Sequence, residues 1–120
     1  MVEIILTSKK VGPEDVDDLL PLTHDPDPKL RAGAVRALCP CHVKAHDERI
    51  WNRIFELAGD ENAGVRRSVF HALRDGSPRA LEAEVLAAFE SFRDDSDKRI
   101  RRSARKLLAQ YRRTGRVNIL

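Results

Sequence analysis

DPDPKLRAGAVRAL, the sequence of residues 25–38, recurs twice more in the chain in the same register. The related segments are residues 60–73 and 95–108, and each step along the chain is 35 residues long. Every segment begins with aspartate and keeps apolar residues at matching positions. A constant period of this length predicts a solenoid, in which similar units of two helices stack side by side.

Apolar residues recur at helical spacing on both sides of each aspartate. Val16, Leu19 and Leu20 precede the first aspartate, and the spacing i, i+3, i+4 places them on one helix face. Pro13 and the pair Ser77-Pro78, read as a helix cap followed by the first helical residue, predict two of the helix starts. We therefore predict an all-α superhelix of three helix pairs. The first helices are expected near 13–23, 47–58 and 78–92, and the second helices near 28–38, 63–74 and 97–112.

The composition predicts one globular domain over residues 1–120. Apolar residues make up 42% and charged residues 34% of the chain, which excludes a disordered protein. No apolar run reaches the length of a membrane span, and the N-terminus does not read as a signal peptide. These features predict a cytoplasmic protein. The repeats are expected over about 13–40, 46–75 and 78–113, after a short extension of residues 1–12.

The third repeat differs from the other two at one position of its second helix. Arg105 stands there, whereas the first two repeats carry Val35 and Phe70. An apolar residue at this position is expected to pack against the next repeat, and a terminal repeat needs a polar outer face. We therefore expect the third repeat to end the stack and the protein to be monomeric.

An arginine follows six residues after the aspartate of each repeat, inside the second helix. With this pattern, residues 13–112 resemble HEAT repeats of the short bacterial kind, which have an armadillo-type helical fold. The resemblance implies a structural ladder, in which carboxylates and guanidinium groups satisfy turn amides and bridge neighbouring repeats. The expected ladder residues are Asp25 and Arg31, Asp60 and Arg66, and Asp95 and Arg101.

Basic side chains remain on the second helices when core and ladder positions are set aside. They recur at i, i+3, i+4 and i+7 spacing, and the resemblance implies that they line the concave side of the solenoid. One reading is an ordinary solvated helix face; the other is a binding groove, because a solvated face usually mixes both signs of charge. The candidate residues are Lys29, Arg36, Arg67, His71, Arg74, Arg99, Arg102, Lys106 and Arg113.

One short segment contains residue types that bind metals. It runs Cys39-Pro40-Cys41-His42 and is followed by His46. Thiolates and imidazoles are zinc ligands, but this spacing is not that of a standard structural zinc site. Cysteines near helix ends are commonly small buried apolar residues. We therefore expect no metal and no other cofactor.

The sequence contains none of the common catalytic motifs, so we do not expect an enzyme. The leading hypothesis is a noncatalytic interaction or scaffold protein that binds an acidic segment of a partner protein in the basic groove. The alternative is binding of nucleic acid through its phosphate backbone in the same groove. Base stacking needs exposed aromatic residues, and the groove offers none beyond Tyr111, which favours a protein partner. No membrane partner is expected.

Overall fold

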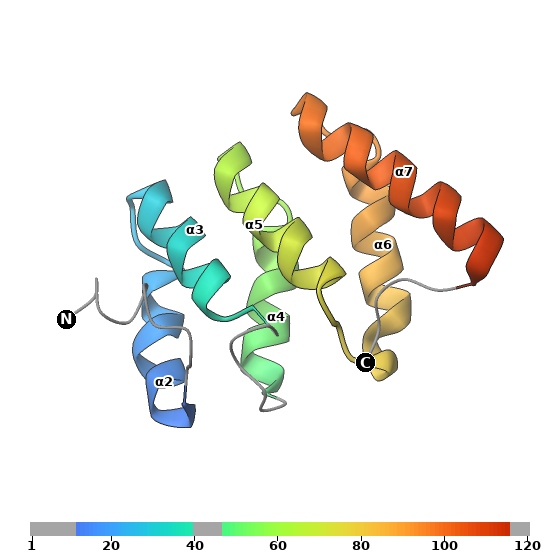
Figure 1. The fold of residues 1–120 in the computed structure, drawn as a ribbon. Helices are drawn as coiled ribbons and strands as arrows, with labels where there is room; N and C mark the ends of the chain where they lie inside the picture. Colours follow the sequence, from blue (N-terminus) through green and yellow to red (C-terminus); the bar gives the residue numbers. More distant parts are fainter. Residues whose placement is uncertain (1–11, 40–46, 116–120) are drawn as a thin grey trace.

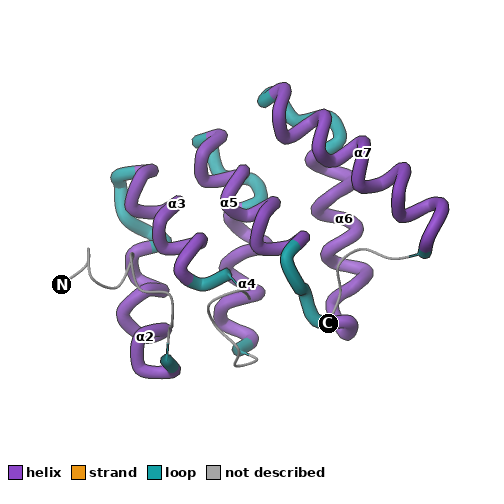
Figure 2. Tube along the Cα trace, viewed as in Figure 1, coloured by secondary structure: helices purple, strands orange, loops and turns teal. Residues whose placement is uncertain are grey.

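The computed structural model describes residues 12–39 and 47–115. These residues form three stacked helix pairs and contain no strands, so the predicted all-α solenoid is confirmed (Figures 1 and 2). None of the described helices combines the length and the apolar character needed to cross a membrane. The pairs are α2 (Pro13–Leu22) with α3 (Pro28–Ala37), α4 (Glu48–Leu57) with α5 (Ala63–Arg74), and α6 (Glu82–Phe92) with α7 (Lys98–Thr114).

The helices form two layers. The first helices of the pairs, α2, α4 and α6, lie in one layer, and the second helices, α3, α5 and α7, lie in the other (Figure 1). Within the second layer, α3 packs along α5, and α7 tilts away from α5. The three second helices therefore lie on the same side of the first layer, in the order α3, α5, α7 (Figure 1).

Each second helix begins at a polar cap that follows the 35-residue period. The Asp27 carboxylate accepts a hydrogen bond from the backbone N–H of Lys29 at 2.9 Å. In the same way, Asn62 caps α5 and Asp97 caps α7. A side-chain oxygen at this position satisfies an N–H group that has no partner within the helix. The repeated sequence thus fixes where each second helix starts.

The core lies between the two layers. Val16, Leu19 and Ile54 are buried in it, as the apolar spacing predicts. The third pair contributes Phe89 and Phe92, whose rings pack against Phe70 of α5 with centroids 5.1 and 5.7 Å away. Aromatic contacts of this kind add to the burial of apolar area. These ring contacts pack the third helix pair against the second.

The start of the third pair differs from the prediction. Ser77 does not cap a helix; its hydroxyl is buried and has no hydrogen-bond partner among the described residues. Gly76 has a φ of 147°, which favours glycine and turns the chain sharply after α5. A 3₁₀ helix, η1 (Arg79–Leu81), then follows, and α6 begins only at Glu82. A capping side chain accepts from the N–H two or three residues further on, and α6 begins five residues after Ser77, so Ser77 cannot cap it.

Two sequence predictions fall on parts of the chain that the structure does not describe. The N-terminal extension lies outside the described residues except for Gly12, which precedes α2. Three of the four candidate metal ligands also lie outside them: Cys41, His42 and His46.

Candidate partner-binding surface

The nine basic residues predicted on the second helices are all exposed, and they lie on α3, α5 and α7. We call this set the basic face. Six of the nine line two hollows between neighbouring helices. The other three, Arg102, Lys106 and Arg113, lie farther along α7 and line neither hollow.

The first hollow lies between α3 and α5 and has a volume of about 670 Å³. Its ionisable lining residues are Lys29, Arg36, Arg67 and His71. Small residues, among them Ala32 and Gly64, also line it, and their size leaves the space between the basic side chains open. No carboxylate belongs to the lining. The hollow is therefore surrounded by one sign of charge.

The second hollow lies between α5 and α7 and has a volume of about 280 Å³. Arg67 and His71 line it as well, so the two hollows adjoin each other. The remaining basic residues of its lining are Arg74 and Arg99, and its apolar part includes Phe70. This lining also contains no carboxylate. Together, the two hollows bring basic residues of all three second helices onto one continuous surface.

Two of these basic residues are held by neighbouring side chains. Arg36 donates a hydrogen bond from Nη1 to Ser68 Oγ at 3.3 Å, and Arg67 Nη1 lies 3.2 Å from Asp97 Oδ1. Lys29, Arg74 and Arg99 make no hydrogen bond or ion pair with other described side chains, so their charges face solvent. Clustered charges of one sign attract ligands of the opposite sign.

The layer of first helices shows a contrasting hollow. It lies between α2 and α4, has a volume of about 460 Å³, and is lined by both acidic and basic residues. Asp17 and Glu56 lie in it beside Arg49 and Arg53, and Arg49 donates to Asp17 Oδ1 at 2.8 Å. Mixed charges that pair with one another are typical of a solvated surface. The two hollows on the basic face therefore differ from the hollow between α2 and α4, because their ionisable lining residues are all basic.

The ladder residues lie on a different part of the second helices, where they connect the turns. Arg31 donates from Nε and Nη2 to the two carboxylate oxygens of Asp60, both at 3.1 Å. Its Nη1 donates to the backbone carbonyl of Asp25 at 2.8 Å. Arg31 therefore ties its own turn to the carboxylate of the next repeat.

The second rung has the same geometry with shorter bonds. Arg66 donates to both carboxylate oxygens of Asp95 at 2.9 Å, and from Nη1 to the Asp60 carbonyl at 2.8 Å. Only 12% of the Arg66 side chain and 8% of the Asp95 side chain are exposed. Arg101, in the third repeat, keeps the carbonyl bond to Asp95 at 2.8 Å but has no carboxylate partner among the described residues. The hydrogen-bonding groups of the six ladder residues thus bind one another and the backbone of the turns.

Each bridging carboxylate also organises its own turn. Asp60 Oδ1 accepts the N–H of Asn62 at 2.9 Å, and Asp95 Oδ1 accepts the N–H of Asp97 at 2.8 Å. Burial alone raises the pKa of both carboxyls, but the hydrogen bonds from Arg31 and Arg66 and from these amides outweigh it. The pKa of Asp60 and of Asp95 therefore lies below the ordinary value.

These lowered pKa values predict a loss of stability in acid. An aspartate in the unfolded chain has a pKa of about 3.9, so on acidification the unfolded chain binds protons before the folded chain does. We expect the two carboxylates to stabilise the fold fully above roughly pH 5. Their contribution should then disappear as the pH falls through the lower folded pKa values. Urea denaturation between pH 7 and pH 3 measures this decline. The variant Asp60→Asn with Asp95→Asn should be less stable at pH 7 and decline less steeply; an equally steep decline would contradict the assignment.

One contact between the first helices was not predicted from the sequence. Arg53 of α4 donates to the hydroxyl and to the carbonyl of the buried Thr23, at 3.0 and 2.9 Å. These bonds join the end of α2 to α4. One period later along the chain, Ala58 takes the position of Thr23 and Ala88 takes the position of Arg53. The contact is therefore not repeated at these positions, and the repeat pattern could not predict it.

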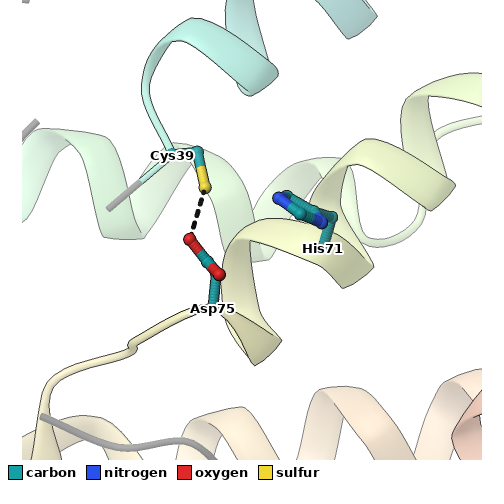
Figure 3. Close-up of side chains that lie close together, drawn as sticks. All are labelled: Cys39, His71 and Asp75. Atoms are coloured by element: carbon teal, nitrogen blue, oxygen red, sulfur yellow. Dashed lines mark hydrogen bonds between the residues drawn. The ribbon is translucent and has the colours of Figure 1, made fainter. Parts of the chain in front are cut away.

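Of the candidate metal ligands, the structure describes Cys39, and it brings two unpredicted residues to it. Cys39 is buried at the end of α3 and donates a hydrogen bond to Asp75 Oδ2, with the sulfur 3.5 Å from the oxygen. His71 lies beside this pair (Figure 3). One donor atom from each of the three side chains lies within 4.8 Å of the others. The sequence signal was the spacing of His71 and Asp75, which places both on one side of the last turn of α5.

Comparison with known proteins identifies the repeat type. The family model for HEAT repeats matches residues 16–109, a range that includes the three helix pairs almost entirely. The chain matches no curated protein and no solved structure. The matched range covers most of the chain, and it contains the repeated ladder and caps described above. The protein therefore belongs to the HEAT-repeat family.

Proposed function

We propose that the protein is a noncatalytic interaction module that binds an acidic segment of a partner protein along the basic face. HEAT repeats generally mediate protein–protein interaction. The observation that carries the proposal is the pair of adjoining hollows, in which every ionisable lining residue is basic. This arrangement favours a ligand that carries several negative charges along its length.

The basic residues that make no hydrogen bond or ion pair with other described side chains are well suited to bind carboxylates. Arg74 and Arg99 lie on opposite sides of the second hollow, on α5 and α7. A guanidinium group binds a carboxylate through two parallel hydrogen bonds, which adds direction to the charge attraction. Phe70 and Ile100 form the apolar part of this lining, and both are buried, so the contacts offered to a partner come mainly from the basic side chains.

Nucleic acid is the alternative ligand, because phosphates are attracted by the same residues. The aromatic content of the hollows argues against it. Phe70 is the single phenylalanine, tyrosine or tryptophan in their lining, and only 7% of it is exposed, so it offers no open ring for stacking a base. Tyr111 lines neither hollow. A protein segment therefore accounts for the surface better than a nucleic acid strand does.

We also expect the protein to act as a monomer. Arg105 is exposed on the third pair and donates to the carbonyl of Arg93 at 3.2 Å. The corresponding Val35 is fully buried, and the corresponding Phe70 packs against Phe89 and Phe92 of the third pair. At this position the third pair thus offers a polar side chain in place of an apolar contact.

An affinity capture from an extract of the native host tests the class of ligand. The immobilised protein is incubated with extract that has or has not been treated with nucleases, and the captured proteins are identified. We expect a protein partner whose capture survives nuclease treatment and falls as salt rises. Capture should be lost with the variant Arg74→Glu, Arg99→Glu. A nuclease-sensitive capture would favour the nucleic-acid alternative, and capture that the variant leaves unchanged would contradict the proposed surface.

A further inference from the structure

The cluster of Cys39, His71 and Asp75 joins the ends of two neighbouring second helices. Cys39 follows the last turn of α3, and its side chain is 1% exposed. His71 lies in the last turn of α5, and Asp75 is the residue that ends this helix. The backbone N–H of Asp75 donates to the His71 carbonyl at 3.0 Å, which fixes the backbones of the two residues relative to each other. The cluster therefore lies where two neighbouring second helices end.

The three side chains offer the donor atoms that a zinc ion prefers. Zinc binds thiolate sulfur, imidazole nitrogen and carboxylate oxygen, most often with four ligands in a tetrahedron. One thiolate and one carboxylate together neutralise a divalent cation. This matters here because the neighbouring Arg67 and Arg74 would repel an ion that kept its net charge. The donor set thus fits zinc in both chemistry and charge.

The geometry needs only a small adjustment. The donor atoms lie within 4.8 Å of one another. Ligands at about 2.0 to 2.3 Å from a tetrahedral zinc ion are separated by about 3.3 to 3.8 Å. The difference is of the order of 1 Å, and because His71 is exposed we expect rotation of its side chain to supply this shift. Three protein ligands leave one position of the tetrahedron for water or another small ligand.

A cysteine nucleophile is the other chemistry that these residue types suggest. In such a site, histidine lies between the cysteine and the carboxylate and takes the thiol proton. Here the Cys39 thiol donates directly to Asp75, and histidine lies to one side (Figure 3). The sulfur is also too deeply buried to meet a substrate. The arrangement therefore does not fit covalent catalysis.

We infer that Cys39, His71 and Asp75 form a binding site for a divalent transition metal ion, with zinc as the expected ion. The inference replaces our expectation from the sequence that the protein binds no metal. It does not depend on the proposed function, although His71 also lines both hollows of the basic face. A bound ion would join α3 to α5 beside the surface that we propose for the partner.

Titration with cobalt tests the site, because Co²⁺ takes the place of zinc and gives a visible spectrum. The full chain, produced without a histidine tag and freed of metal, is titrated with Co²⁺ under reducing conditions. We expect one equivalent to bind, with a thiolate-to-cobalt charge-transfer band and the strong visible absorption of a tetrahedral site. Added Zn²⁺ should displace the cobalt. Absence of both features at stoichiometric cobalt would overturn the inference.

Variants assign the ligands. Cys39→Ser should abolish the charge-transfer band. His71→Ala and Asp75→Ala should each weaken cobalt binding by at least about 100-fold, because loss of even an outer partner of a metal ligand costs about 10- to 100-fold. The exposed His24 lies in the turn after α2 and lines the hollow between α2 and α4, so it provides the control His24→Ala, which should bind as the wild type does. Circular dichroism checks that each variant keeps its helices. If Cys41→Ser abolishes binding and Asp75→Ala does not, the ion lies elsewhere and the assignment is wrong.

Discussion

Replacing Arg74 and Arg99 with glutamate should weaken binding of an acidic peptide by at least about 100-fold at low salt. Like charges brought together in an interface cost several kcal/mol, and each 1.4 kcal/mol corresponds to a factor of ten in affinity. Both residues are exposed, line the second hollow and make no hydrogen bond or ion pair with other described side chains. Fluorescence anisotropy with a labelled peptide rich in glutamate and aspartate measures the affinity.

A matched control separates the position of the charges from their number. Arg79 and Arg112 are also exposed, and neither lines the two hollows. The variant Arg79→Glu, Arg112→Glu changes the net charge by the same amount and should reduce affinity far less. Exposed substitutions usually change stability by no more than about 0.5 kcal/mol each, so both variants should unfold much as the wild type does. Equal losses of affinity in the two variants would show that the peptide responds only to overall charge.

The second large effect is expected in the ladder. Arg66→Ala should lower the free energy of unfolding by about 1 to 3 kcal/mol, because it leaves the largely buried Asp95 carboxylate without its guanidinium partner. It also removes the hydrogen bond to the Asp60 carbonyl. Urea denaturation at neutral pH measures the change.

Arg101 offers an internal comparison for this prediction. It occupies the same position in the third repeat and makes the carbonyl bond to Asp95, but no described carboxylate bridges it to a further repeat. Arg101→Ala should therefore cost less than Arg66→Ala. If the two variants unfold at the same urea concentration, the bridge between repeats contributes little, and the ladder stabilises each turn separately.

The fold was predictable because the same pattern of helix caps and apolar positions occurs three times in the sequence. The positions of Asp27, Asn62 and Asp97 are enough to locate the start of each second helix, and the apolar spacing locates the core. The prediction failed where the third unit departs from the pattern. Gly76 turns the chain in a conformation that favours glycine, and the buried Ser77 that follows it does not act as a cap.

The site was predictable only in part, for a physical reason. Helical spacing shows which basic residues share one face of one helix, but the space between helices depends on how α3, α5 and α7 pack. The sequence therefore did not separate the residues that line the hollows from Arg102, Lys106 and Arg113. The contact of Cys39 with Asp75 joins residues 36 positions apart and occurs in one repeat only. The 35-residue period of the sequence therefore does not predict this contact.

The central claim is that an acidic protein segment binds to the surface formed by α3, α5 and α7. An NMR titration of the isotope-labelled protein with the acidic peptide tests it most directly, because each backbone amide reports on its own surroundings. We expect the largest shifts at residues around the two hollows, including Arg67, Arg74 and Arg99, and little change on α2 and α4. Shifts that centre on the first helices, near Asp17, Asp18 and Glu48, or the absence of any saturable shift, would contradict the claim.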